Sequence, residues 1–414
     1  MPASVVAGEV APGYEPVRKA FEHNFAARGE LGAACAIFAG GRKVVDLWGG
    51  FRETVPQRRW EHDTPVLVYS LTKGMTALVA ATAVSRGLFA YEMRVADIWP
   101  EFAAQGKQAV TVRQLLSEQA GLAAVDVDLT LEDLADPLKI ARQLAAQTPD
   151  WTPGDRSGNH AYSLGWLVGE LIRRTDPRGR TLGSFFHEEI AKPLGLADQF
   201  YIGLPATVPE SRLARIDGFK PYQMLLHPVT LPPGMLLALL CPWSLTSRTL
   251  NNPKLSQGPA ELDQRKHWSV EDGGAGGIGT ARALATIYHA FVTDSPVLRL
   301  RREVLQALAE QPVDPRLGIR DAVLKTNVRY SLGLEKPCAG LEFGTSHASF
   351  GTFAVGGSFA YGDPAAGVGY AYVTNRLGFY KWSDPREWAV RKVFSACLEA
   401  DRGNAARPPE AHAD

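Results

Sequence analysis

Hydrophobic positions near the start of the chain change from helical to strand-like spacing. Ala and Phe recur at helical spacing over residues 18–28, which predicts a helix. Two short apolar segments, 34–38 and 43–48, then flank the pair Gly40-Gly41. Because glycines adopt the positive φ angles of tight turns, this pattern predicts a β-hairpin.

The middle of the chain has mainly helical patterning, broken by Pro-rich loops. The strongest segment is rich in Ala, Leu and Met and is followed by Gly87, which is typical of a helix C-terminus. The predicted helices are 72–86, 111–119, 131–147 and 164–174.

The last third of the chain contains strand-like segments separated by glycine turns. The predicted strands are 353–355, 358–361 and 367–374, between a helix over 280–292 and an amphipathic helix over 387–400. Strands at both ends and helices between them predict an α+β fold, with one antiparallel sheet built from both termini and flanking helices. We expect residues 1–70 and 265–414 to form this part, and residues 71–264 to form an inserted, mainly helical subdomain.

Charge and composition narrow the choice of substrate. The 414 residues include 44 Lys plus Arg and 44 Asp plus Glu, so the net charge is zero. The chain therefore has no excess of basic charge that would attract nucleic acid or an anionic membrane, and a small-molecule substrate is favoured. The start of the chain lacks the basic and apolar regions of a signal peptide, and no apolar run approaches about 20 residues, so we expect a cytoplasmic protein without a membrane partner. The four separated cysteines predict buried free thiols.

The candidate chemistry begins at Ser70, where an apolar segment meets the predicted helix 72–86. Lys73 follows three residues later, so the two side chains share one helix face. Free backbone N–H groups and the helix dipole stabilise negative charge at such a serine. A lysine partly withdrawn from water gives up its proton more easily and can accept the serine proton. A capping serine beside a solvated lysine is the alternative, but the apolar surroundings favour a catalytic pair.

The chain resembles the serine β-lactamase and DD-peptidase superfamily, in the branch of β-lactamase-like carboxylesterases called family VIII esterases. Segments with the family's motifs occur in the expected order between about Phe21 and Asn375. They are Trp48-Gly49-Gly50, Ser70-x-x-Lys73, Val112 to Leu116 with Ala120-Gly121-Leu122, Trp151-x-Pro153-Gly154, Pro193-Leu194-Gly195, Gly276 to Thr280, and Gly356-Gly357-Ser358 with Asp363-Pro364. The resemblance implies the β-lactamase/DD-peptidase fold, with the active site at the junction of the two parts. We expect neither a metal nor a cofactor.

The family's second motif is altered. Members carry a tyrosine after the Trp-x-Pro-Gly segment that shares proton transfer with the lysine, and an ungapped alignment places Asn159 there. Tyr162 lies three residues further on and is our candidate base, because an asparagine cannot accept a proton at neutral pH. Either Tyr162 reaches Ser70, or Asn159 occupies the site and Tyr162 belongs to the core. His160 is a third candidate, for which a structural role is expected.

The third motif also departs from the family. Thr352 stands where members have lysine or histidine, and the resemblance implies that the backbone N–H groups of Ser70 and Val355 form the oxyanion hole. Loss of the cation weakens the hold on a substrate carboxylate and argues against a true β-lactamase. Glu118 replaces a common histidine, which we assign to packing around the first helix. The candidates for the substrate pocket are Asn159, His160, Thr352 and Trp243.

We therefore expect a serine hydrolase that acts on a small carboxylic ester through an acyl-Ser70 intermediate. Two alternatives remain open. The first is an acyltransferase of biosynthetic metabolism that passes the acyl group to an amine or alcohol. The second is an inactive binding protein that has kept the fold.

Overall fold

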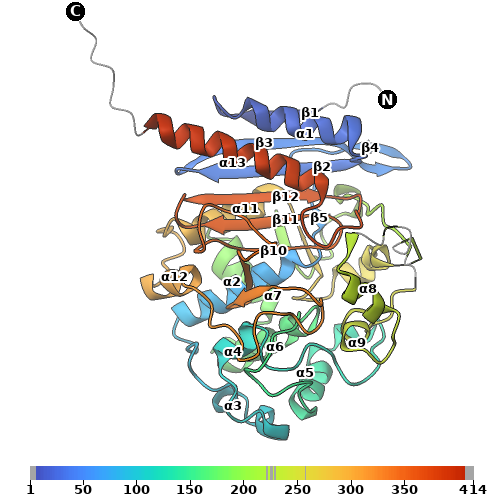
Figure 1. The fold of residues 1–414 in the computed structure, drawn as a ribbon, viewed down its shortest axis with the longest axis vertical. Coiled ribbons are helices and arrows are strands. Elements are labelled where there is room, and N and C mark those ends of the chain that lie inside the picture. Colours follow the sequence, from blue (N-terminus) through green and yellow to red (C-terminus); the bar gives the residue numbers. More distant parts are fainter. Residues whose placement is uncertain (1–5, 221, 224–226, 228–229, 257, 406–414) are drawn as a thin grey trace, which may run out of the picture.

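A large antiparallel sheet contains strands from both ends of the chain (Figure 1). The computed structural model describes residues 6–220, 222–223, 227, 230–256 and 258–405. The strand order is β1-β3-β2-β12-β11-β10-β9-β8, with β4 paired to β3. The strands are β1 (Val6–Val10), β2 (Gly32–Ala39), β3 (Arg42–Thr54), β4 (Gln57–Arg59), β8 (Arg329–Ser331), β9 (Leu334–Lys336), β10 (Phe350–Phe353), β11 (Phe359–Asp363) and β12 (Val368–Thr374). The predicted α+β fold is confirmed.

The predicted N-terminal hairpin forms from β2 and β3. Gly40 and Gly41 connect these strands with φ angles of 57° and 78°, which glycine adopts without steric cost. Strand β12 pairs with β2, from Gly369 opposite Phe38 to Thr374 opposite Ala33. This pairing joins the two ends of the chain into one sheet.

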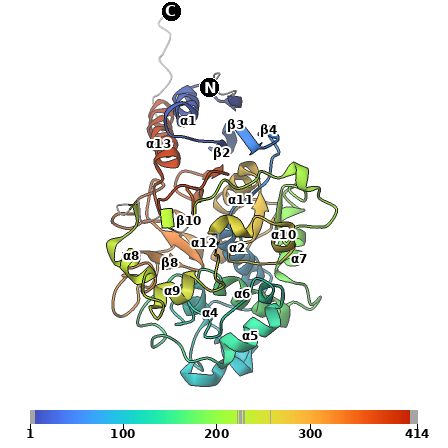
Figure 2. The same ribbon diagram turned by 90° about the vertical axis from the view of Figure 1, so that its right-hand side faces the viewer.

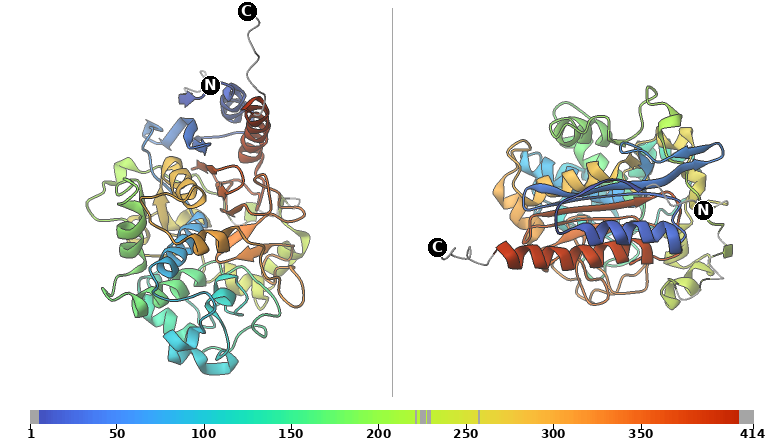
Figure 3. Two further views of the ribbon diagram at one scale, coloured as in Figure 1. Left: turned by 90° about the vertical axis from the view of Figure 1, so that its left-hand side faces the viewer. Right: turned by 90° about the horizontal axis from the view of Figure 1, so that it is seen from above.

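Helices cover both faces of the sheet. Helices α1 (Glu15–Ala27) and α13 (Pro385–Ala405) lie side by side on the outer face, as Figures 1 and 3 show. Helix α11 (Ala281–Val292) packs on the inner face against β2, β11 and β12. The remaining helices extend below the sheet (Figure 2).

Helix α2 (Leu71–Ser85) lies in the centre of this lower part, and every one of its residues is buried. The helix that the Ala-, Leu- and Met-rich sequence predicted is therefore a core helix. The other helices are α3 (Val95–Ile98), α4 (Val112–Leu116), α5 (Pro137–Ala146), α6 (Ser163–Thr175), α7 (Leu182–Phe186), α8 (Pro233–Leu239), α9 (Leu245–Leu250), α10 (Arg265–Trp268) and α12 (Arg302–Ala309). Short 3-10 or π segments are Pro100–Gly106, Asp133–Ala135, His187–Ala191, Glu210–Arg212 and Pro259–Leu262.

Some predicted boundaries differ from the structure. The predicted helix 131–147 begins only at Pro137, because proline favours the first turn of a helix and Asp136 caps it through the Lys139 N–H. The predicted strand 353–355 is displaced toward the N-terminus, since β10 ends at Phe353 and a turn with positive φ at Gly356 and Gly357 follows. The subdomain boundaries near residues 70 and 265 remain predictions.

A small second sheet fixes the start of α2. Its strand order is β5 (Val66–Leu67), β7 (Gly277–Gly279) and β6 (Phe200–Ile202). A Cβ atom at Gly279 would lie 2.1 Å from the Phe200 ring, so only glycine permits this packing. The segment that enters α2 is thereby held by residues distant in sequence.

All four cysteines are free. Cys35, Cys338 and Cys397 are buried as predicted, but Cys241 is exposed because it follows the short surface helix α8. None of the helices in the described ranges is both long enough and apolar enough to cross a membrane.

Candidate active site

Ser70 occupies the residue directly before α2, where the backbone makes a sharp turn. Tyr69 adopts a φ of 47°, in the left-handed region that is uncommon for a residue with a side chain. The Thr72 hydroxyl donates to the Tyr69 carbonyl (2.5 Å) and accepts from the Gly277 N–H (2.8 Å). Ser70 makes no side-chain capping hydrogen bond. The turn is therefore held by Thr72, and the Ser70 hydroxyl is left for chemistry.

Lys73 is buried one helical turn after Ser70. Its Nζ atom donates a 2.8 Å hydrogen bond to Asn159 Oδ1 and lies 3.4 Å from Glu118 Oε1. Only 3% of the Lys73 side chain and 1% of the Glu118 side chain are exposed. A lysine so deeply withdrawn from water needs such partners, because an unpaired buried charge is very costly.

Glu118 was missed as a site residue by the sequence analysis, which assigned it to packing. Its carboxylate faces Lys73, and Glu118 Oε2 has no hydrogen-bond partner among the described residues. Burial raises the pKa of Glu118 from 4.5 to about 7, although the positive charge of Lys73 acts in the opposite direction. The signal in the sequence was a carboxylate in place of the family's histidine, and such a buried charge requires a cationic partner.

The structure brings Asn159, rather than Tyr162, to Lys73. Tyr162 precedes α6, stacks on Trp166 with ring centroids 6.4 Å apart, and lines the cavity that contains Ser70. Burial raises the pKa of Tyr162, so its side chain stays a neutral phenol that can donate a proton but is a poor base. Whether Tyr162 takes part in proton transfer remains a prediction.

His160 is completely buried and does not line this cavity. Its Nδ1 atom lies 2.7 Å from the Gly158 carbonyl oxygen, which matches a structural role. Burial lowers the pKa of His160 to about 4, so the ring is neutral near pH 7.

Val355 lines the same cavity as Ser70 and lies on the turn after β10. Within the described ranges, the backbone N–H groups of Ser70 and Val355 have no hydrogen-bond partner. Two such free donors at one cavity are suited to hold a developing oxyanion. Thr352 is buried near Gly74 and Tyr288 and does not line the cavity.

The cavity has a volume of about 230 Å³ and a predominantly apolar lining. Trp243 does not contribute to it, since it is 85% exposed beyond the end of α8. The lining residues are Tyr69, Ser70, Asn159, Ala161, Tyr162, Phe219, Leu231, Met235, Leu239, Leu250, Asn251, Leu255, Gly258, Pro259, Leu262, Ala275, Leu324, Val355, Gly378, Phe379, Tyr380 and Lys381. No group of three metal-ligating side chains occurs among the described residues.

Comparison with known proteins gives consistent matches over nearly the whole chain. The sequence profile of the Beta-lactamase family matches residues 17–393. The esterase/beta-lactamase LipL of Mycobacterium tuberculosis (strain ATCC 25618 / H37Rv) is 33% identical over 376 residues, which cover 90% of this chain and 83% of LipL. A crystal structure of a family VIII carboxylesterase matches with a TM-score of 0.81 and 32% identity, over 95% of this chain and 99% of that chain. A penicillin-binding protein homologue from Caulobacter crescentus matches with a TM-score of 0.79 and 33% identity, with the same coverage.

Proposed function

Because the chain belongs to the Beta-lactamase family, in its esterase branch, we propose that it hydrolyses small carboxylic esters through an acyl-Ser70 intermediate. The observation that carries this proposal is the shared position of Ser70 and Val355 on an apolar cavity, with the buried Lys73 one helical turn from Ser70. A nucleophile, a proton acceptor and two free N–H donors are the groups that acyl transfer requires.

In the acylation step, Ser70 Oγ attacks the ester carbonyl carbon while the Lys73 amine acts as the base and takes the hydroxyl proton. The N–H groups of Ser70 and Val355 stabilise the oxyanion. The tetrahedral intermediate collapses, the bond to the leaving oxygen breaks, and that oxygen receives a proton from Lys73. The Tyr162 phenol, which lines the same cavity, is a second candidate donor to the leaving alcohol.

In deacylation, Lys73 takes a proton from a water molecule that attacks the acyl carbon, and Ser70 Oγ leaves with that proton as the acid is released. Asn159 Oδ1 orients the amine throughout, since an amide oxygen accepts a hydrogen bond from either form of the lysine. Glu118 faces the same amine and has a pKa of about 7, so its carboxyl group can hold a proton when Lys73 does not.

The experiment is intact-mass analysis after exposure to a p-nitrophenyl ester or a fluorophosphonate. We expect one adduct on the wild-type protein and none on Ser70→Ala. A wild-type protein without adduct, or an equal adduct on Ser70→Ala, would exclude acyl-Ser70 chemistry and favour a non-catalytic binding protein.

Acyl transfer to an amine or alcohol would use the same intermediate, and the apolar cavity lining favours an organic acceptor over water. The two outcomes are separated by following products from one ester with and without a panel of acceptors. Transfer slower than hydrolysis for every acceptor would leave hydrolysis as the function.

A further inference from the structure

We propose that Lys381 binds an anionic group of the substrate, so that the enzyme acts on esters that also carry a carboxylate. This inference rests on the proposed ester hydrolysis at Ser70. Lys381 lies between β12 and α13, far in sequence from the Ser70 and Lys73 motif. Among the described residues that line the cavity, it has the only charged side chain.

The family's usual cation position cannot serve this purpose here. Thr352 occupies that position, is 1% exposed and lies outside the cavity lining. A Cβ atom added at Gly74 would lie 2.8 Å from Thr352 Oγ1, so α2 packs closely over this residue. The positive charge at the cavity therefore comes from another loop.

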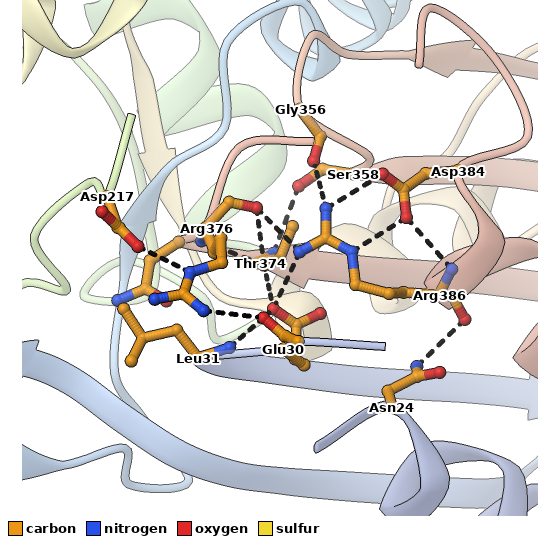
Figure 4. A network of polar contacts seen from close by, with 12 residues as sticks. Asn24, Glu30, Leu31, Asp217, Gly356, Ser358, Thr374, Arg376, Asp384 and Arg386 are labelled. Atoms are coloured by element: carbon orange, nitrogen blue, oxygen red, sulfur yellow. Dashed lines mark hydrogen bonds and ion pairs between the residues drawn. The ribbon is translucent and has the colours of Figure 1, made fainter. Parts of the chain in front are cut away.

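The loop that carries Lys381 is held against the turn that contains Val355. Gly378 N–H donates to the Gly356 carbonyl (2.9 Å), and Arg386 Nη2 donates to the same oxygen (2.8 Å). Figure 4 shows Arg386 between Asp384, Glu30 and the Gly356 carbonyl. The loop that carries Lys381 is thus anchored on both sides of Lys381, at Gly378 and at Arg386, to the turn that contains Val355.

The Lys381 amine is available to a ligand. In the described part of the chain it makes no hydrogen bond and no ion pair within 4.0 Å. Its Nζ atom lies over the Trp382 ring, 5.0 Å from the centroid. Burial lowers the pKa of Lys381, while the negative charge of Glu335 opposes this effect. A cation in such surroundings gains from a carboxylate partner, since charge-assisted hydrogen bonds strengthen away from water.

These observations define the substrate class. The apolar walls accept hydrocarbon parts of the ester, and one ammonium group selects an anion on it. A half-ester of a short dicarboxylic acid has this chemistry. A neutral ester of the same shape lacks the partner for Lys381.

The test compares two substrates of equal shape, the mono-p-nitrophenyl ester of glutaric acid and its neutral carboxamide analogue. The variants are Lys381→Met and Lys381→Glu. Lys392→Met is a matched control, because Lys392 is exposed and its Nζ also lies 5.0 Å from a tryptophan ring centroid. We expect the ratio of kcat/KM for the anionic and neutral esters to fall about 10- to 100-fold in Lys381→Met. The ratio should fall further in Lys381→Glu and stay unchanged in Lys392→Met.

An equal loss on both esters in Lys381→Met would overturn the proposal, because Lys381 would then only neutralise Glu335. Failure of the wild-type protein on both esters would instead contradict the proposed hydrolysis. Calorimetric titration with glutaric acid monoamide then decides the binding question without catalysis. Binding that is lost in Lys381→Met and kept in Lys392→Met supports the proposal, and absence of binding to the wild-type protein overturns it.

Discussion

Lys73 Nζ donates to Asn159 Oδ1 at 2.8 Å, and the resemblance to the family implies a tyrosine at the Asn159 position. In the proposed mechanism the amine itself acts as the base while the amide holds it in place, because an amide cannot remove a proton from Ser70. The phenol of Tyr162 is separate from this pair, on the cavity wall. In the proposed mechanism Asn159 therefore positions the amine, and proton donation by Tyr162 stays a prediction.

Asn159→Ala should lower kcat/KM about 10- to 100-fold, because it leaves the buried Lys73 amine without its amide acceptor. Tyr162→Phe should have a smaller effect on p-nitrophenyl esters and a larger effect on alkyl esters, whose leaving group needs a proton. Steady-state kinetics on both ester types checks this. A greater loss in Tyr162→Phe on p-nitrophenyl esters would assign the base role to Tyr162.

Glu118→Gln should change how stability depends on pH. The folded-state pKa of Glu118 is raised from 4.5 to about 7, mainly by burial, with Asp321 and Glu335 adding to the shift. A raised carboxyl pKa means that the folded state binds the proton more tightly. The stabilisation of the folded state by this protonation is therefore complete below pH 4.5 and is lost as the pH rises through 7. Between pH 4.5 and 7, the free energy of unfolding of the wild-type protein should therefore fall by up to about 3 kcal/mol relative to that of Glu118→Gln.

Urea unfolding at pH 4.5, 5.5, 7 and 8 measures this difference. Asp176→Asn is the control, because its pKa is lowered to about 2, chiefly by the hydrogen bond from Arg180. The Asp176→Asn curve should stay parallel to the wild-type curve above pH 4.5. A parallel curve for Glu118→Gln as well would show that Glu118 titrates normally.

Gly74→Ala tests how closely α2 packs on strand β10. Alanine favours a helix by about 1 kcal/mol over glycine, yet the new Cβ would lie 2.3 Å from Tyr288 Oη and 2.8 Å from Thr352 Oγ1. We expect a net loss of about 1–3 kcal/mol, and a lower kcat because Thr352 belongs to β10, which leads to Val355. Gly403→Ala, with open space around the new methyl group, should not be destabilised. Denaturation midpoints and kcat of both variants measure these effects. A gain in stability in Gly74→Ala would contradict this close packing.

Sequence reasoning located the elements whose signals are local. The hairpin at Gly40-Gly41 and the apolar helix α2 follow from nearby residues alone. The same holds for Ser70 and Lys73, which lie three residues apart at the start of α2. The partners of Lys73 come from segments 45 and 86 residues away, so no periodicity could select Glu118 or choose between Asn159 and Tyr162. Lys381 was missed for the same reason, since only tertiary packing brings its loop to the cavity.

Figure 4 shows Arg386 at the centre of a buried group of ion pairs. Arg386 is 6% exposed and contacts Glu30 and Asp384, whose side chains are 0% and 3% exposed. Arg386→Met would leave both carboxylates without their cation, which costs about 3–5 kcal/mol. Arg376→Met is the matched control, because Arg376 and its partner Asp217 are 43% and 45% exposed, and such a pair contributes about 1 kcal/mol or less.

Urea midpoints of the two variants check the stability difference, and kcat checks the link to catalysis. Arg386→Met also removes a donor from the Gly356 carbonyl, next to the Val355 N–H. The surviving folded protein should therefore show a lower kcat with a smaller change in KM, because the oxyanion is bound mainly in the transition state. Equal stability losses in the two variants would contradict a stabilising buried network. An unchanged kcat in Arg386→Met would show that this network does not affect the Val355 N–H as an oxyanion donor.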